Sequence, residues 1–214
     1  MLLNYLSNLP SLFRVNLANS RSRLVLGRRT RLDLRRGSEV SSSGPVHIGF
    51  PLPNRPTRPS RNITKIVVEP GGKLVFEGIT HLSNGCYVYV GKGAELVFRG
   101  DNFIGSDTTI LCNKRVVIGR NSCISWDCDL IDDDTHQFHL PDGTPKQKKI
   151  HELIIGDHVA IQMGVAIPRG VNVSSGSIIA AKTVVRQDIE QHTLVYQNPE
   201  LTVKEGITYG FEFF

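Results

Sequence analysis

The chain has 214 residues, of which 40% are hydrophobic and 21% are charged, and its formal net charge is +5. This length predicts one domain, or one domain with a tail, and the composition argues against wholesale disorder. No apolar run reaches the roughly 18 residues of a transmembrane helix, and the N-terminal stretch lacks the features of a secretory signal. We therefore expect a cytoplasmic protein without stable membrane insertion.

The positive charge is concentrated near the N-terminus. Residues 1–62 contain eleven Arg and no Lys against Asp33 and Glu39, a balance of 11 − 2 = +9, and the remainder carries 14 − 18 = −4. The stretch 21–36 has the charge of a nucleic-acid patch, but its arginines alternate with leucines at strand spacing and no aromatic residue is interleaved for base stacking. We favour a solvent-exposed strand face with no nucleic-acid partner. An acidic polymer or an anionic membrane surface stays a candidate neighbour of that face.

The first hundred residues contain a repeated unit. Segments 24–37, 66–78 and 88–100 each have an aliphatic residue, a Leu six positions later, a Leu or Phe two positions beyond it, and a closing Gly. We expect repeating coils from about residue 24, with residues 1–22 forming a short helix or a loose cap. The Pro- and Ser-rich stretch 37–62 predicts an extended excursion from the coils.

A period of six dominates the C-terminal half. The aliphatic residues in this register are Ile155, Ile161, Ile167, Val173, Ile179 and Val185. The residues four positions after each of them are small or β-branched, and the spacing of six also occurs upstream at Ile118, Ile124 and Leu130. One inward aliphatic residue in every six is typical of a hexapeptide β-solenoid, in which three short strands form one triangular coil. Neither an α-helix nor a simple alternating strand has this period.

Residues 131–139, IDDDTHQFH, hold the densest group of proton-transfer and metal-ligand side chains in the chain. Three interpretations are open: a metal cage, a general base with its orienting carboxylate, and a solvated acidic loop. The cluster lies between two blocks of hexads, so we predict a functional loop excursion near 131–150. The histidines in and after the cluster are spaced by three or seven residues, which does not indicate converging ligands, and we expect no catalytic metal.

The four cysteines are Cys86, Cys112, Cys123 and Cys128. None of them forms a CxxC pair, and each has apolar or small neighbours. This pattern favours reduced, packed thiols over a zinc site or a disulfide framework.

At this point the sequence resembles a known family. The segment 154–189, together with ISWDCDLIDDDTH at 124–136 and QNPE at 197–200, is similar to hexapeptide-repeat O-acetyltransferases. These are left-handed β-helix enzymes that include maltose, galactoside and capsular-polysaccharide acetyltransferases. The resemblance implies an all-β fold, namely a left-handed parallel β-helix over 23–195, followed by a C-terminal tail at 196–214. The handedness comes from the family alone.

The resemblance also implies an activity, an acetyl-CoA-dependent O-acetyl transfer to a sugar or polysaccharide hydroxyl. His136 matches the family's catalytic histidine, and imidazole is suited to accept a hydroxyl proton near neutral pH. Asp134 and Asp132 are then the candidates to fix the tautomer of His136, with Asp134 preferred. Asp132, Asp129 and Trp126 are the candidates to bind the sugar.

The expected coenzyme groove lies along the C-terminal hexads. Its candidate residues are Gly164, Ala180, Ala181, Lys182, Arg186 and Arg169, of which the cations would meet the coenzyme's phosphates. The chain departs from the family pattern here, with Ala160 in place of a usual Trp and with Gln162, Lys182 and Gln197 in place of usual glycines. These changes either reshape the groove or block it. The alternative function is therefore a non-catalytic β-solenoid scaffold or binding protein with a degenerate groove.

The family implies an assembly as well, a homotrimer with active sites between subunits. Val165, Val171 and Ile189 are expected beside the inward positions on an apolar flank. An aromatic tail of Phe211, Phe213 and Phe214 adds apolar surface of the kind that marks an interface. Sugar-nucleotide pyrophosphorylases carry a similar solenoid behind a large nucleotide-binding domain. We set them aside because the chain has no room for that domain.

Overall fold

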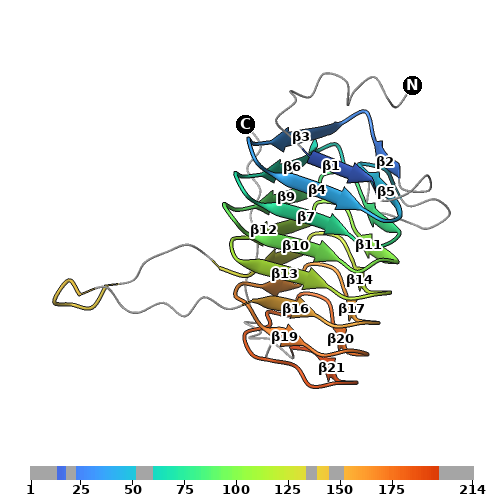
Figure 1. The fold of residues 1–214 in the computed structure, drawn as a ribbon. Coiled ribbons are helices and arrows are strands. Elements are labelled where there is room, and N and C mark those ends of the chain that lie inside the picture. The colour runs from blue at the N-terminus through green and yellow to red at the C-terminus, as the bar shows by residue number, and fades with distance from the viewer. Residues whose placement is uncertain (1–13, 18–22, 52–59, 134–138, 145–151, 198–214) are drawn as a thin grey trace, which may run out of the picture.

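The computed structural model describes residues 14–17, 23–51, 60–133, 139–144 and 152–197 (Figure 1). Every named element in these ranges is a β-strand. Among the same residues there is no helix long and apolar enough to cross a membrane.

The strands form three parallel sheets, one for each face of a triangular coil. Sheet A contains β1 (Arg14–Leu17), β4 (Glu39–Ser42), β7 (Lys73–Phe76), β10 (Glu95–Phe98), β13 (Arg115–Ile118), β16 (Leu153–Ile155) and β19 (Asn172–Val173). Sheet B contains β2 (Arg23–Leu26), β5 (Pro45–Ile48), β8 (Thr80–Leu82), β11 (Asn102–Ile104), β14 (Cys123–Ile124), β17 (Ala160–Ile161), β20 (Ile178–Ile179) and β21 (Leu194–Val195). Sheet C contains β3 (Thr30–Leu34), β6 (Thr64–Val68), β9 (Tyr87–Val90), β12 (Thr109–Cys112), β15 (Asp129–Ile131) and β18 (Ala166–Ile167).

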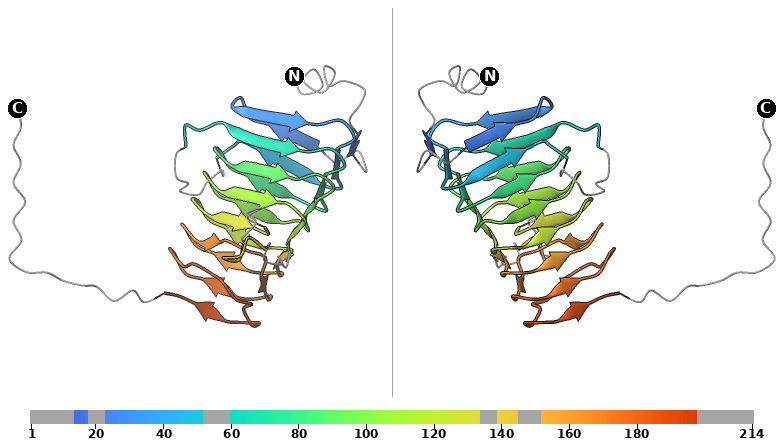
Figure 2. Two further views of the ribbon diagram at one scale, coloured as in Figure 1. Left: turned by 90° about the vertical axis from the view of Figure 1, so that its left-hand side faces the viewer. Right: turned by 90° about the vertical axis from the view of Figure 1, so that its right-hand side faces the viewer.

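Successive coils visit the three sheets in the order A, B, C and stack from the N-terminal to the C-terminal end (Figure 2). In Figure 1 the strands of sheet A run from left to right in front, and those of sheet C run from right to left behind, while the chain descends. This sense of winding is left-handed. The fold is therefore the predicted all-β, left-handed parallel β-helix.

The predicted inward register is confirmed. All six aliphatic residues from Ile155 to Val185 have at most 2% of their surface exposed. The residues four positions later are buried too, and Val165, Val171 and Ile189 belong to the hydrophobic core. The expectation that these three residues lie on an outer flank is wrong. Their side chains point into the prism and pack in the hydrophobic core.

The coils begin earlier than the sequence pattern indicated. Strand β1 pairs with β4 in sheet A, although residues 14–17 were expected in a cap. The stretch 37–62 is mostly coil, since β4 and β5 both lie in it with Val40, Val46 and Ile48 buried. The excursion is confined to the connection between β5 and β6. Pro45, Ser41 and Ser42 lie in strands of the coil, so Pro and Ser do not by themselves mark a departure from the solenoid.

The three repeated units predicted in the first hundred residues do not share one face. Segments 66–78 and 88–100 run from sheet C to sheet A, whereas 24–37 runs from sheet B to sheet C. The first unit is therefore displaced by one face of the prism. A six-residue repeat allows this because each face has the same hydrophobic pattern.

The excursion predicted near 131–150 is present. Strand β15 ends at Ile131 and the next strand, β16, begins at Leu153, whereas β12 and β13 are separated by Asn113 and Lys114 alone. Residues 139–144 lie well outside the coil stack (Figure 1). The inserted segment therefore leaves the solenoid between sheet C and sheet A.

Three of the four cysteines are packed as expected. Cys86, Cys112 and Cys128 are buried and free, and burial raises the pKa of all three thiols, that of Cys86 to about 12 and that of Cys128 to about 11. Cys123 differs because it faces outward on sheet B and is exposed. The three inner thiols behave as small apolar side chains of the core.

Ile167 provides a test of the register. Replacing the fully buried Ile167 with Asp places an unpaired carboxylate in the core, so we expect Ile167→Asp to lose more than about 4 kcal/mol of unfolding free energy. Ile178→Asp is the matched control, because Ile178 points outward and is 41% exposed. Denaturant unfolding measures both variants, and equal losses would show that the assigned register is wrong.

Candidate active site

His136 and Asp134 lie outside the described residues, so their catalytic roles remain predictions. The structure does describe the start of the inserted segment, up to Asp133, and a turn at 139–144 in which the Gly143 N–H donates to the Leu140 carbonyl at 2.9 Å. His139 is exposed at the beginning of that turn. The candidate site is therefore described from the base of the insertion, where Asp132 and Asp133 lie.

Asp132 anchors that base. Its carboxylate accepts the backbone N–H of Asn113 on Oδ1 at 2.8 Å, and those of Lys114 and Arg115 on Oδ2 at 2.7 and 2.8 Å. The carbonyl of Asp132 accepts the Gly170 N–H at 3.0 Å. The residue is 2% exposed. Both carboxylate oxygens are thus already bonded inside the protein, which gives Asp132 a structural role in place of the predicted contact to sugar.

A hydrogen bond between Asn113 and Asp133 also fixes the base of the insertion to the preceding coil. The side-chain amide of Asn113 donates to the Asp133 carbonyl at 2.8 Å. Sequence reasoning missed Asn113, because its partners lie about 20 residues away and meet it only when coils stack in register. The chain therefore leaves the solenoid for His136 from a point that is fixed to the preceding coil.

The predicted sugar-binding residues lie just before the insertion. Asp129 is exposed and points outward on sheet C, between Thr109 and Ala166 of the adjacent strands. Trp126 is partly buried at the preceding corner, between sheets B and C, where its carbonyl accepts the Gly164 N–H at 3.0 Å. Asp129 thus shares a face with the base of the insertion, and Trp126 does not.

The corner between sheets B and C brings several predicted coenzyme residues together. Asp127, Gly164 and Lys182 stack there with φ of 62°, 65° and 63°, the left-handed conformation that glycine adopts most readily. The Lys182 side chain passes over Gly164, because a Cβ added at Gly164 would collide with it. Its Nζ lies 3.7 Å from Asp127 Oδ2. The ammonium group therefore occupies the surface of this corner.

Glutamine side chains cover backbone donors beside the same corner. Gln162 Oε1 accepts the Ala181 N–H at 3.1 Å, and Gln197 Oε1 accepts the Val184 N–H at 3.0 Å. Ala180 lies next to them and is partly buried. Two N–H groups that a ligand would otherwise meet are bonded to the protein itself.

The remaining predicted coenzyme residues lie elsewhere. Arg169 and Arg186 are both exposed at the corner between sheets C and A. Gly164, Ala180, Ala181 and Lys182 are gathered at the other edge of sheet C. The six predicted residues therefore divide into two groups with sheet C between them.

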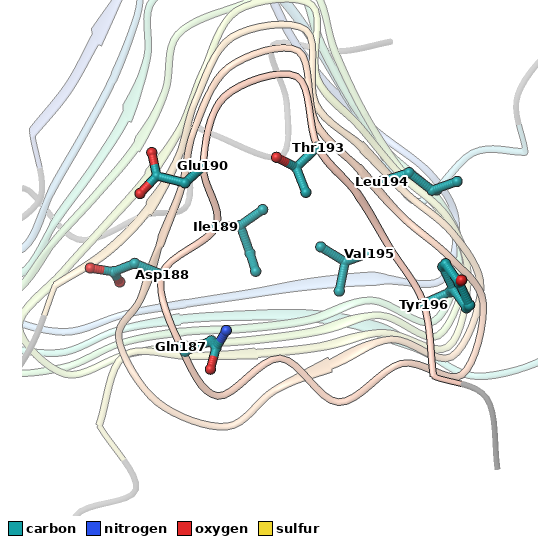
Figure 3. Close-up of a pocket in the computed structure, with 8 residues that line it drawn as sticks. All are labelled: Gln187, Asp188, Ile189, Glu190, Thr193, Leu194, Val195 and Tyr196. Carbon is teal, nitrogen blue, oxygen red and sulfur yellow. The ribbon is translucent and has the colours of Figure 1, made fainter. Parts of the chain in front are cut away.

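The pocket in Figure 3 is separate from these residues. It lies at the C-terminal end of the solenoid, where Ile189 and Val195 point into the last coil and Asp188 and Tyr196 point away from it (Figure 3). This pocket is the open end of the hydrophobic core. Across the ranges that the structure describes, no three His, Cys, Asp or Glu side chains are grouped to hold a metal ion.

Comparison with known proteins confirms the predicted resemblance. No family model matches the chain. The chain is 32% identical over 114 residues to the bifunctional protein GlmU of Methanococcus vannielii. This match covers 53% of the chain and 25% of that protein. It is 31% identical over 121 residues to the putative acetyltransferase YJL218W of Saccharomyces cerevisiae, covering 54% of the chain and 61% of that protein. The chain is related in sequence to acetyltransferases.

Among solved structures, the polySia-specific acetyltransferase NeuO matches with a TM-score of 0.49 and 20% identity over 88% of this chain and 84% of that one. The sequence matches each span about half of this chain and less than two thirds of the curated relatives. They support a shared acetyltransferase ancestry, whereas the reaction and its substrates are argued below.

Asp132 yields a test that separates anchoring from substrate contact. Asp132→Ala leaves three partly buried backbone N–H groups without their acceptor, so we expect a loss of about 3 kcal/mol in unfolding free energy. Asp129→Ala is the control, and its exposed side chain predicts a change within about 0.5 kcal/mol. Denaturant unfolding compares the two variants. A stable Asp132→Ala protein that has lost only sugar affinity would contradict the anchoring role.

Proposed function

We propose that the protein is an acetyl-CoA-dependent O-acetyltransferase that acts on a sugar or polysaccharide hydroxyl. The observation that carries this proposal is the insertion between β15 and β16, which holds His136 and starts from a base anchored by Asp132. The sequence similarity to a putative acetyltransferase supports the reaction class.

The reaction follows from the chemistry of a thioester and an alcohol. His136 accepts the proton of the sugar hydroxyl while its oxygen attacks the acetyl carbonyl carbon. The tetrahedral intermediate then collapses, the carbon–sulfur bond breaks, and the imidazolium of His136 returns the proton to the departing thiolate. Asp134 holds the neutral tautomer and stabilises the imidazolium, and backbone N–H groups of a neighbouring coil stabilise the oxyanion.

The acceptor and the coenzyme would approach along different parts of the coil. Asp129 has its carboxylate in solvent on the face from which the insertion leaves, so it is placed to accept hydrogen bonds from sugar hydroxyls. Trp126 offers a partly buried ring at the adjacent corner. Lys182 at one corner, and Arg169 and Arg186 at the other, provide cations for the coenzyme's phosphates.

A specific observation favours the alternative, a non-catalytic scaffold. Lys182 covers Gly164 and lies beside Asp127, and Gln162 bonds the Ala181 N–H, so the expected groove is partly filled by the protein's own side chains. These contacts are exposed and cost little to break, so a coenzyme can displace them. Calorimetric titration with coenzyme A decides between the functions: an enzyme binds it, and a scaffold with a degenerate groove does not.

The role of His136 is tested by removing the imidazole. A positioned base contributes roughly 10²–10⁴ in rate, so His136→Ala should lower acetyl transfer by at least about a hundredfold while coenzyme A binding is retained. His139→Ala is the matched control, since His139 is exposed three residues away. Mass spectrometry of the acetylated acceptor measures both variants. Turnover of His136→Ala near that of the parent would exclude this residue as the base.

Assembly can be tested by mass. A site on a single flat coil face is open to water, whereas a groove between subunits excludes it, so we expect a homotrimer with three shared active sites. Light scattering should then give three times the chain mass of 23.7 kDa. A particle with the mass of one chain and full activity would contradict the shared site.

A further inference from the structure

The N-terminal half of sheet C carries uncompensated positive charge. Residues 27–37 and 60–70 contain seven Arg or Lys against Asp33 and Glu69, a balance of 7 − 2 = +5. These segments comprise β3, β6 and the corners on either side of them. The seven basic residues are called the basic band below. They extend across the full width of the face in the first two coils.

The register of sheet C aligns the band with the rest of the face. Arg31 pairs with Lys65, Lys65 with Tyr87, Tyr87 with Thr109, and Thr109 with Asp129. Their neighbours along each strand, such as Ile66 and Val88, point inward with no exposed surface, so this column points outward. Four strand spacings of roughly 4.8 Å place Arg31 roughly 19 Å from Asp129 along the prism.

Little within the protein neutralises the band. Among the described residues the basic band makes one ion pair, in which Arg35 Nη2 lies 3.3 Å from Asp33 Oδ2. Arg28, Arg31 and Arg36 are exposed and have no ion pair to any described side chain. These three guanidinium groups are therefore available to an external anion.

Sheet A, built on the same register, has the opposite arrangement. Its outward column alternates in sign through Lys73, Glu95, Arg115 and Glu152 on successive coils. Arg115 bridges Glu95 at 3.2 Å and Glu152 at 3.1 Å. Stacked coils can thus satisfy their own charges, and on sheet C the chain does not do so.

Aromatic rings continue the band toward the insertion. Tyr87 and Tyr89 both point outward from β9, the next strand of the sheet. Lys65 Nζ lies 5.8 Å above the centre of the Tyr87 ring, which holds the ammonium group at the junction. One face of that ring is therefore already covered, which is unfavourable for the base stacking that single-stranded nucleic acid needs. Sugar hydroxyls can instead bond the tyrosine hydroxyls at the ring edge.

We propose that the basic band and the two tyrosines bind a polyanionic glycan, a polysaccharide bearing carboxylate or phosphate groups, and lead it along sheet C toward Asp129 and the insertion. The destination rests on the proposed acetyl transfer, because the polymer would then be the acceptor. The binding itself does not require catalysis. Long-range attraction at the band would raise the local concentration of acceptor near the site.

Binding is tested with the full-length protein and oligomers of polygalacturonate, with dextran as the uncharged comparison. The double variant Arg31→Ser/Lys65→Ser removes two charges at the centre of the band. Arg99→Ser/Arg120→Ser is the matched control, because these exposed arginines lie on corners between sheets A and B. Calorimetry at low salt should show polygalacturonate binding weakened about fivefold by the first pair and unchanged by the second, and dextran should not bind. Thermal melting confirms that both proteins fold.

The outcomes separate this proposal from the proposed function. Unchanged polygalacturonate binding in Arg31→Ser/Lys65→Ser, or equal binding of dextran, overturns the band as a glycan site. Tighter binding of a single-stranded oligonucleotide or of anionic lipid vesicles than of polygalacturonate also overturns it, in favour of that partner. Band-dependent glycan binding by a protein that transfers no acetyl group supports the glycan site and refutes the transferase. If both are correct, the band variant raises KM for the polymer and leaves KM for a monosaccharide unchanged.

Discussion

The stack of inward aliphatic side chains is the constraint on which the rest of this structure depends. Successive coils place residues such as Ile124, Ile161 and Ile179 at the same register position of sheet B, one above the other. None of these three is more than 2% exposed. A single coil cannot bury this surface, so coils are stable only in register with their neighbours. The register in turn fixes which outward residues are adjacent, and every contact of the candidate site follows from that adjacency.

Most of the fold could be predicted because the period of six appears directly in the sequence. The register from Ile155 to Val185 needed no knowledge of tertiary contacts. The stretch 37–62 was harder, because Pro, Ser and Gly form the corners of a coil as well as the loops that leave it. The informative signal there was the spacing of Val40, Val46 and Ile48, which repeats by six or two within a polar background.

The candidate site could be predicted only in part, for a physical reason. The insertion was visible as an interruption of the hexads, but the partners of Asp132 lie 17 to 19 residues upstream in the preceding coil. Three N–H donors converge on one carboxylate only through stacking, and a sequence pattern does not encode which corner faces it. Composition alone therefore made Asp132 resemble a substrate ligand, whereas its burial and its bonds make it an anchor.

Both long insertions of the solenoid are tied to it by an aspartate, which indicates how a repetitive scaffold accommodates irregular function. The segment between β5 and β6 returns to the coils where Ser60 and Asn62 donate to Asp107 Oδ1 at 2.6 and 2.7 Å. Gly85 is required beneath this contact, because a Cβ there would collide with Asp107 and Ser60. Asp132 performs the equivalent role for the second insertion. A carboxylate suits both positions because it accepts several hydrogen bonds at once, from side-chain donors at Asp107 and from backbone N–H groups at Asp132. Insertions at corners thus leave the core stack intact, and function can vary there without altering the register that holds the coils together.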